Sequence, residues 1–408
     1  LAFAAYMALM TPFVQTRLVD YFTRILEERT GTTISIGRVE FRPIESLILN
    51  DVFVRDCRQD TLVFCERLVM KVDSVSFVKR RFTITAFEKA KFNLWIERRQ
   101  DGGESLTNVE QLINSFSSSK ADTVPQTSSG WNVNLTQVIL KDCRFRYIES
   151  DYEPTDYGIN WTDVECRNLN VRIFGIDFSN KQYRAKIDGL RFREKSGFEV
   201  TNMGGEVVAS DDNLLITNTF IQTKQSKVYL DTLEYNWVPE HDYWRNFTTR
   251  MQQRYVFTDS RVNFDDLAYF NGKLLGMHNT VFGSGVVFNT INNLEGRDLE
   301  VYLGDKSVLH GSFASHGLPA FFETDFNIDF TDTKVSPPEL EAIYMPWLES
   351  HYVKIPEILH KYDVFTFDGN FQGKIEDFAI KARTTTPGMV GSVLFNCVMD
   401  NIGDIRYD

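Results

Sequence analysis

VQTRLVDYFTRILEERTGTTISIGRVEFRPIESLILNDVFVRD, residues 14–56, changes from helical to extended periodicity within one segment. Apolar residues recur at helical spacing as far as Ile25, and Gly31 stands where a helix C-cap is expected. From Ile34 onward apolar and polar residues alternate, with a turn at Pro43. The stretch therefore predicts one amphipathic helix that leads into a series of strands, and most of the later chain alternates in the same way.

The residues before this stretch, LAFAAYMALMTPFVQ (1–15), carry no charge. A bilayer span needs about 20 apolar residues, so the run is short by itself, and the initial Leu favours a longer chain upstream. We interpret the run as the exit end of a membrane anchor, with a buried N-terminal helix as the alternative. A cleaved signal peptide is disfavoured because no small-residue cleavage site follows. The predicted anchor residues are Leu1, Phe3, Tyr6, Met7, Leu9, Met10 and Phe13.

The composition of the 408-residue chain is that of a folded, strand-rich protein. It is 43% hydrophobic and 25% charged, which excludes a disordered chain, and its 33 Phe and 16 Tyr suit strands. A net charge of −12 argues against nucleic-acid binding. The five cysteines form no C-x-x-C pair, so we expect buried thiols rather than a metal site, with bridges Cys57–Cys65 or Cys143–Cys166 as the alternative.

The chain divides by composition into four segments. Residues 1–28 hold the anchor end and the amphipathic helix, and residues 29–116 form a first β segment. This segment ends in a predicted helix over 107–116, in which Thr107 and Glu110 form a capping box. Residues 117–130 are a Ser/Thr-rich linker. Residues 131–408 continue the strands, with short helices near 240–276 (240–254 and from Asp265) and near 338–361 and no repeat of fixed period.

A search for catalytic or cofactor-binding residues gives nothing. The six histidines are scattered without an H-E-x-x-H pair, and there is neither a G-x-S-x-G elbow nor a complete dinucleotide fingerprint. Asp211-Asp212 and Asp265-Asp266 are explained as a turn and a helix start. We therefore predict a protein that is not an enzyme and needs no metal or cofactor.

The alternating apolar positions of the strands are the functional candidates. Alternation is the same in a sandwich, a barrel and an open curled sheet, and on pattern alone a closed core is favoured. If the sheet were open, its inner face would be filled by a ligand with apolar chains. The candidate lining residues are Leu68, Met70, Val72, Phe82, Ile84, Val138, Leu140, Leu169, Val171, Ile173, Val228 and Leu230.

Three pieces of the sequence resemble the N-terminal, AsmA-like part of TamB proteins, in the version found in Bacteroidetes-type bacteria. The first is the opening, with TPFVQTRLVDYFTRILEERTGTTISIGRVEF, LILNDVFVRD and DTLVFCERLVMKV in order. The second is DSRVNFDDLAYFNGKLLG (259–276). The third is FDGNFQGKIEDFAIKARTTTPGMVGSVLFN, with a Gly-x-Phe-x-Gly, Asp-Phe, Thr-x-x-Gly series. The resemblance covers nearly the whole chain, and its order and spacing are more specific than any one piece.

This resemblance implies a mainly β fold: an elongated antiparallel sheet curled into an open groove (a "β-taco"), with an N-terminal membrane helix and a few short helices. It implies a single-pass inner-membrane protein of a Gram-negative bacterium that faces the periplasm. It also implies support of outer-membrane biogenesis, and we expect the protein to conduct phospholipid between the membranes along the groove, by contact with acyl chains. An Omp85-type partner (TamA or a BamA-like protein) would bind through a C-terminal domain that these 408 residues do not include.

Two other functions remain open at the level of the sequence. One is a scaffold or chaperone whose sheet edges pair with incoming outer-membrane strands and aid their insertion with the Omp85-type partner. The other is an extracellular sandwich protein such as an adhesin or a glycan-binding domain.

Overall fold

The computed structural model describes most of the chain. The described residues are 33–42, 46–56, 58–76, 81–101, 104–111, 136–150, 153–179, 182–238, 246–346, 351–386, 391–399 and 405–407, with Arg17 and Gly388. The predicted anchor residues (1–13) and the predicted linker (117–130) lie outside this set. Within it, no helix is long and apolar enough to cross a bilayer.

The protein is mainly β, as predicted, and it separates into two compact units. The first unit comprises residues 1–177 and 185–201, and the second comprises residues 178–184 and 202–408. The first unit holds the long strands of the chain. Its strands are β1 (Ile34–Arg42), β2 (Ser46–Arg55), β3 (Thr61–Ser76), β4 (Arg81–Asp101), β5 (Glu104–Thr107), β6 (Gln137–Glu149), most of β7 (Asp163–Ser179) and most of β8 (Gln182–Glu194).

Strands β1 to β4 of the first unit pair antiparallel in chain order. The order then changes, because β6 pairs with β4 in parallel and the short β5 pairs with the last residues of β4. A helical turn begins at Asn108, directly after β5. Its capping box is confirmed: the Glu110 N–H donates to Thr107 Oγ1 at 3.0 Å, and the Thr107 N–H donates to Glu110 Oε2 at 2.6 Å.

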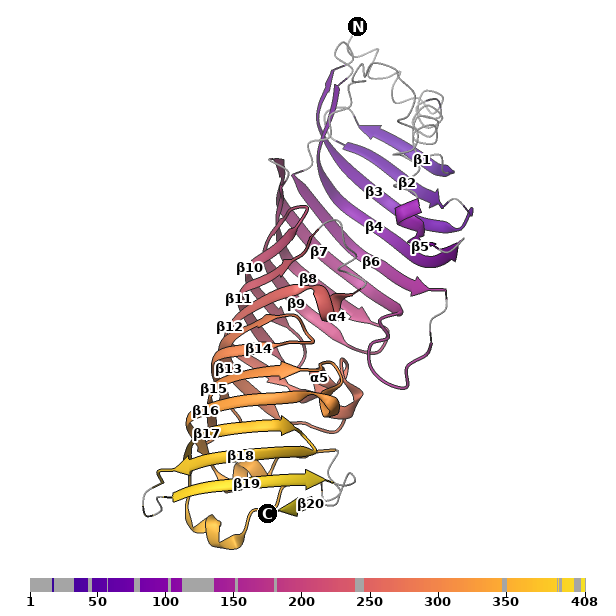
Figure 1. Cartoon of the computed structure of the whole chain (residues 1–408). Coiled ribbons are helices and arrows are strands. Elements are labelled where there is room, and N and C mark those ends of the chain that lie inside the picture. Colours follow the sequence, from indigo (N-terminus) through magenta and orange to yellow (C-terminus); the bar gives the residue numbers. More distant parts are fainter. Residues whose placement is uncertain are drawn as a thin grey trace. The chain divides into compact units, whose positions relative to one another are not determined.

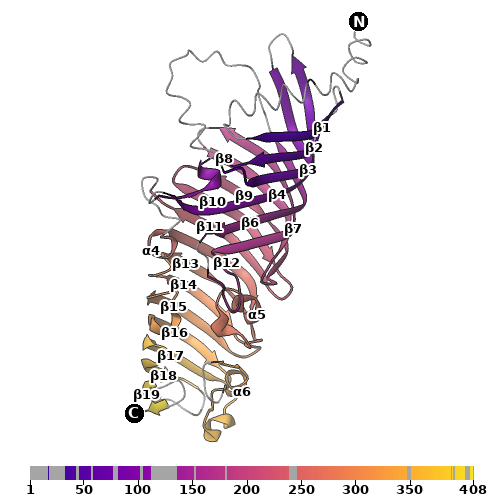
Figure 2. The ribbon, with the colours of Figure 1, turned by 90° about the vertical axis from the view of Figure 1, so that its right-hand side faces the viewer.

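The second unit is an antiparallel ladder in which each strand pairs with the next along the chain (Figures 1 and 2). Short polar turns join many of the strands, as the spacing of turn residues in the sequence predicts, and longer segments that contain short helices join the others. The strands are β9 (Glu199–Ala209), β10 (Asn213–Gln222), β11 (Lys227–Asn236), β12 (Gln252–Asn263), β13 (Thr280–Asn289), β14 (Glu295–Tyr302), β15 (Val308–His316), β16 (Asp325–Val335), β17 (Phe365–Lys374), β18 (Asp377–Thr384), β19 (Gly391–Met399) and β20 (Ile405–Tyr407).

Every second strand from β10 to β16 contains a β-bulge. The register shifts by one residue at Asn218, Asp259, Asp298 and Asp332. Each of these residues has a positive φ, between 42° and 51°. Asn and Asp tolerate this left-handed conformation better than other side chains, and a bulge bends its strand and increases its twist. The acidic and amide residues inside these strands are therefore bend positions.

The helical segments of the second unit are shorter than the sequence predicts. The predicted helix over 240–254 is wrong at its end, because α4 (Phe247–Arg250) ends at Arg250 and β12 begins at Gln252. The first three residues of β12, Gln252 to Arg254, are all polar, so the sequence shows no alternation of apolar and polar residues that would predict a strand there. Over 338–361 the described helical pieces are α6 (Pro337–Glu341) and the 3₁₀ turn η3 (Glu357–Lys361). The remaining short helices are α5 (Phe264–Ala268), η1 (Gly272–Leu274) and η2 (Phe321–Glu323).

Helix α5 starts where predicted and has a structural task. Asn263 caps it by accepting a hydrogen bond from the Asp265 N–H. The buried Asp266 accepts hydrogen bonds from Thr223 Oγ1 at 2.6 Å and from Ser226 Oγ at 2.5 Å. The Asp-Asp pair thus ties the turn between β10 and β11 to the helix after β12, and a structural role explains it.

Candidate apolar binding face

The cross-strand register of the first unit places six of the twelve predicted lining residues in two rows. Residues that face each other across a ladder point to the same side of the sheet. Three of the predicted residues, Val72, Phe82 and Ile84, lie outside these rows: Val72 pairs with Ile84, and Phe82 pairs with Val75. Leu169 lies opposite Cys143 in a further pair. One row runs Val39, Leu49, Leu68, Ala90, Leu140, Val171 and the other runs Phe41, Leu47, Met70, Phe87, Val138, Ile173.

One end of this face is a packed hydrophobic core. Ile34, Ile36, Val39, Leu47 and Met70 form a buried cluster, and Leu68 packs against it. Toward β6 and β7 the rows are less buried. Val171 is still buried, but the other predicted residues there are half-buried, namely Val138, Leu140, Leu169 and Ile173.

A longer row crosses eleven strands of the second unit, from β9 to β19. Only two residues of this unit, Val228 and Leu230, are among the sequence-predicted lining residues. Leu230 lies opposite Phe257 in the neighbouring row, and Val228 lies opposite Ile221. The sequence shows each strand's alternation but not which positions meet across the ladder. The row comprises Val207, Ile216, Leu233, Tyr255, Val287, Gly296, Phe313, Ile328, Phe371, Ile380 and Phe395.

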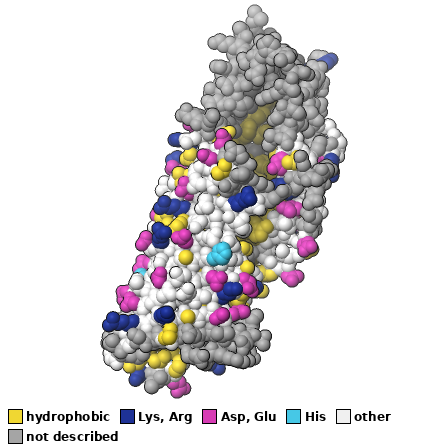
Figure 3. All heavy atoms as spheres, viewed as in Figure 1, with side chains coloured by type: hydrophobic (Ala, Val, Ile, Leu, Met, Phe, Trp, Pro, Cys, Tyr) yellow, Lys and Arg dark blue, Asp and Glu magenta, His cyan; other side chains and the backbone are white. Residues whose placement is uncertain are grey.

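We call this row and its apolar neighbours on the same side the apolar face of the second unit. The row residues from Val207 to Ile380 are half-buried, apart from Gly296, which is buried. The adjacent row points to the opposite side. It is apolar in β9 and β10, with Val208 and Leu215, and mostly polar from β11 onward: Glu234, Arg254, Phe288, Glu295, Ala314, Asn327, Gln372 and Ala379. In Figure 3, positive and negative side chains are interspersed over the visible surface of this unit. From β11 onward the two sides of the sheet thus differ in polarity.

Glycines opposite large side chains keep the apolar face continuous. A Cβ added at Gly296 would lie 2.3 Å from the Phe313 ring, so this ring covers the only position of the row that lacks a side chain. A Cβ added at Gly369 would lie 2.9 Å from the Phe330 ring, and one added at Gly285 would lie 2.6 Å from the Leu299 side chain. Gly369 opens the Gly-x-Phe-x-Gly series of the sequence, which therefore has a packing reason.

The bulges place hydroxyl groups within this apolar face, and the backbone satisfies them. Ser260 Oγ accepts a hydrogen bond from the Tyr229 N–H at 3.0 Å and donates to the Tyr229 carbonyl at 3.2 Å. Thr333 Oγ1 makes the same pair of bonds with His310, both at 3.3 Å. Each hydroxyl replaces ladder bonds that the bulge interrupts, so neither is left free on the apolar side. The segments FTDSRV (257–262) and FTDTKV (330–335) are the sequence signal of this arrangement.

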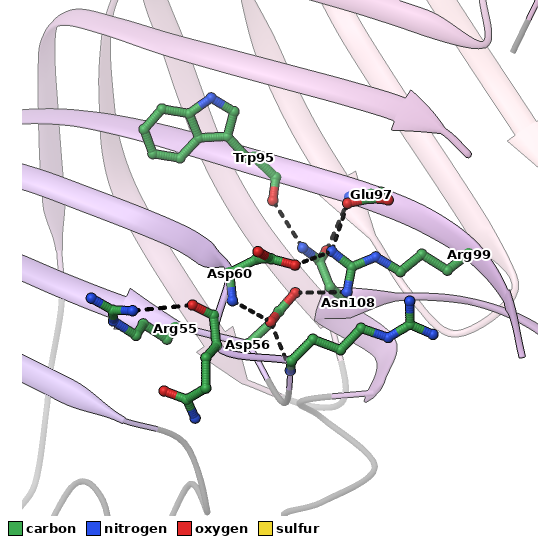
Figure 4. A network of polar contacts seen from close by, with 9 residues as sticks. Arg55, Asp56, Asp60, Trp95, Glu97, Arg99 and Asn108 are labelled. Atoms are coloured by element: carbon green, nitrogen blue, oxygen red, sulfur yellow. Dashed lines mark hydrogen bonds and ion pairs between the residues drawn. The ribbon is translucent and has the colours of Figure 1, made fainter. Parts of the chain in front are cut away.

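The most buried polar network lies in the first unit, around Arg99 (Figure 4). The Arg99 guanidinium contacts Asp56 at 3.2 Å, Asp60 at 2.8 Å and Glu97 at 2.6 Å. Asp56 is fully buried, and its Oδ1 accepts the backbone N–H groups of Arg58 and Asp60, both at 2.9 Å. Asn108 joins the network by bonding both the Glu97 N–H and the Trp95 carbonyl. The network fastens the β2–β3 turn to the end of β4, which is a structural role.

The three cysteines whose side chains are described are free thiols, in agreement with the preferred prediction. Cys65 and Cys143 are buried and Cys166 is half-buried. Burial raises the pKa of Cys65 and of Cys166 to about 11, so both stay protonated near neutral pH. No group of three or more metal-ligating side chains occurs in the described part of the chain.

Comparison of the chain with family models, with curated proteins and with solved structures found no match.

Proposed function

We propose that this protein binds lipid through acyl chains laid along the apolar faces of its sheet, which would form an open groove. The observation that carries the proposal is the apolar row of β9–β19, which from β11 to β17 lies behind a mostly polar opposite side of the sheet. Its large residues are half-buried, from Val207 to Ile380, whereas a closed sandwich core would bury them. A long, partly accessible apolar strip of this kind is typical of a binding surface.

Such a strip suits a ligand that moves. Each methylene group withdrawn from water contributes about 0.8 kcal/mol, so a long acyl chain is held firmly by contact area alone. Because similar side chains recur at every strand, the free energy changes little as the chain shifts by one strand spacing. Lipid could therefore pass along the sheet without a catalytic residue or a fixed site at each step.

The cellular setting of the proposal comes from the sequence resemblance. We propose an inner-membrane anchor in residues 1–13, a periplasmic position for the sheet, and transport of phospholipid toward the outer membrane with an Omp85-type partner. The polar side of the second unit suits an aqueous compartment, because it carries charges of both signs, with Arg254 between Glu234 and Glu295 along the polar row.

The first test is lipid analysis of the natively purified chain. Mass spectrometry of the protein extracted in mild detergent should find phospholipid that survives washing. The matched comparison is a pair of double variants on the two sides of the same strands. Leu233→Asp with Ile328→Asp should abolish lipid retention, and Thr232→Asp with Asn327→Asp, which point to the polar side, should retain it. Equal retention in the two variants would overturn the proposal.

A second variant pair tests the first unit. Leu140→Asp with Val171→Asp places two carboxylates opposite each other in one apolar row. We expect loss of lipid transfer between donor and acceptor vesicles, with circular dichroism and unfolding of the second unit unchanged. Unimpaired transfer would contradict a role for this row. If the native protein instead crosslinks to unfolded outer-membrane strands and retains no lipid, the scaffold function is the better account.

A further inference from the structure

The apolar face of the second unit is roofed at one point, over β15 to β18. The floor there is made by residues of the apolar face, among them Leu309, Phe330, Ile380 and Ala382. The roof comes from α6, from η3 and from the segment that precedes η3. Figure 2 shows α6 beside these strands. Floor and roof enclose a pocket of about 510 Å³, which falls within the range of roughly 300–1,000 Å³ typical of small-ligand sites.

The roof is held in place by specific bonds. The Glu339 carboxylate accepts backbone N–H groups of Asp305, Lys306 and Ser307, at 2.7 to 3.0 Å for the shortest contact of each. Burial alone would raise the pKa of Glu339, but these hydrogen bonds outweigh it and lower the pKa. These bonds fasten α6 to the turn between β14 and β15, so the pocket is formed before any ligand arrives.

A second carboxylate joins the two halves of the roof. Glu341 on α6 accepts the Ile355 N–H at 2.7 Å and pairs with His360 of η3 at 3.3 Å. Both oxygens of Glu341 are thereby engaged within the roof. A preformed pocket of this kind binds more tightly than one that must be ordered, because no conformational entropy is lost on closure.

The chemistry of the lining defines the ligand. Among the described lining residues only Thr333 and Lys354 have polar side chains, and the Thr333 hydroxyl is used by the His310 backbone. Lys354 is exposed, and no ion pair of its ammonium group occurs within the described residues. The pocket thus offers an apolar interior, and Lys354 is the one charged residue among its described lining residues. Its charge complements an amphiphile that has an apolar chain and an anionic head.

We propose that this pocket seats the single acyl chain of an anionic amphiphile, with its carboxylate or phosphate head next to Lys354. The proposal deepens the proposed function, because it rests on acyl-chain binding by the same face. It adds one fixed seat to a face that otherwise offers only sliding contacts. A free fatty acid and a lysophospholipid share the required chemistry.

Equilibrium dialysis of the full chain in amphipol tests the seat with three probes: oleate, oleoyl lysophosphatidic acid and the neutral monoolein. Lys354→Gln should lower the affinity for oleate and for lysophosphatidic acid by about fivefold, as expected for an exposed ion pair. The affinity for monoolein should not change. The matched control is Lys381→Gln, on β18 but pointing to the polar side, which should change nothing. If the Lys354 variant loses more affinity for one of the two anionic probes than for the other, that probe carries the preferred head group, carboxylate or phosphate. Equal affinities in the Lys354 and Lys381 variants would overturn the proposal.

A steric variant and a crosslink locate the chain independently of Lys354. Leu359→Trp fills the pocket from the roof and should lower oleate affinity by about tenfold or more. Diazirine-labelled oleate should crosslink to the wild-type peptides that carry Leu340 and Leu359, which holds even if the Trp variant does not fold. A different outcome is that oleate binds and crosslinks outside this pocket, and that Leu233→Asp with Ile328→Asp abolishes the binding. In that case the proposed seat in the pocket is wrong, and the proposed function of the apolar face stands. If none of the three probes binds and no phospholipid is retained, both are wrong.

Discussion

The apolar rows of the first unit end in a packed core, whereas the row of the second unit stays accessible along its length. Val39 is 2% exposed and Met70 6% exposed in the first unit, but the large row residues of the second are half-buried. The first unit builds its core from aliphatic side chains and fastens its turns with buried charges around Arg99. The second unit uses aromatic rings over glycines and bulges at Asn and Asp. The same alternation of polar and apolar residues thus yields a core in one place and a surface in another.

The largest effect is expected for the charge network of the first unit. Arg99→Met leaves the buried Asp56 without its cation, and removing one partner of a buried pair costs about 3–5 kcal/mol. Hydrogen exchange of β2 to β4 should accelerate, while exchange in the second unit stays unchanged. The double variant Asp56→Asn with Arg99→Met should recover much of the loss. Normal protection in Arg99→Met alone would show that the network is dispensable.

A matched pair of leucines measures the contrast between core and surface directly. Leu47→Ala in the buried cluster should lower the free energy of unfolding of the first unit by about 2–5 kcal/mol. Leu233→Ala in the second unit removes the same atoms from a half-buried position and should cost about half as much, because less apolar area is involved. Denaturant unfolding followed by hydrogen exchange in each unit gives both values. Equal costs would remove the distinction between the two faces.

A smaller effect tests the aromatic-over-glycine packing that is specific to the second unit. Gly369→Ala places a methyl group 2.9 Å from the Phe330 ring and 2.3 Å from the Lys381 carbonyl, and overpacking costs about 1–3 kcal/mol. The double variant with Phe330→Leu should regain the part that is due to the ring. If the second substitution brings no recovery, the backbone contact alone requires glycine.

The smallest effect concerns pH and the first unit. Burial by itself would raise the pKa of Glu165, but the hydrogen bonds and charges of Arg167 and Arg144 outweigh it and lower the pKa to about 2. The stabilisation is therefore complete above pH 4.5, the ordinary value, and is lost as the pH falls toward 2. Because both arginines are partly exposed, Glu165→Gln should cost about 0.5–1 kcal/mol at pH 7.

The control for this prediction is the pH profile itself. Unfolding midpoints of the wild type and of Glu165→Gln should converge as the pH approaches 2. A difference that stays constant down to that pH would assign the effect to packing rather than to charge.

Some elements of the fold followed directly from short sequence signals. The capping box of Thr107 and Glu110 and the start of α5 were predicted correctly, because each depends on residues within one helical turn. The predicted helix over 240–254 was wrong at its end, because tertiary pairing with β11 and β13 makes residues from Gln252 onward a strand. Six of the candidate lining residues fall in the two rows of the first unit, namely Leu68, Met70, Val138, Leu140, Val171 and Ile173, but the row of the second unit was missed.

The sequence by itself determined that this chain is built of strands with one apolar side, since alternation with a period of two is a local property. It also contained the bulge positions, as Asx residues within strands such as Asp259 and Asp332, although nothing local marked them as bends. Only the tertiary structure decided the cross-strand register, the parallel return of β6 to β4, and the roof over β15 to β18. These depend on residues far apart in the chain, and each bulge moves every following side chain by one position relative to its neighbour.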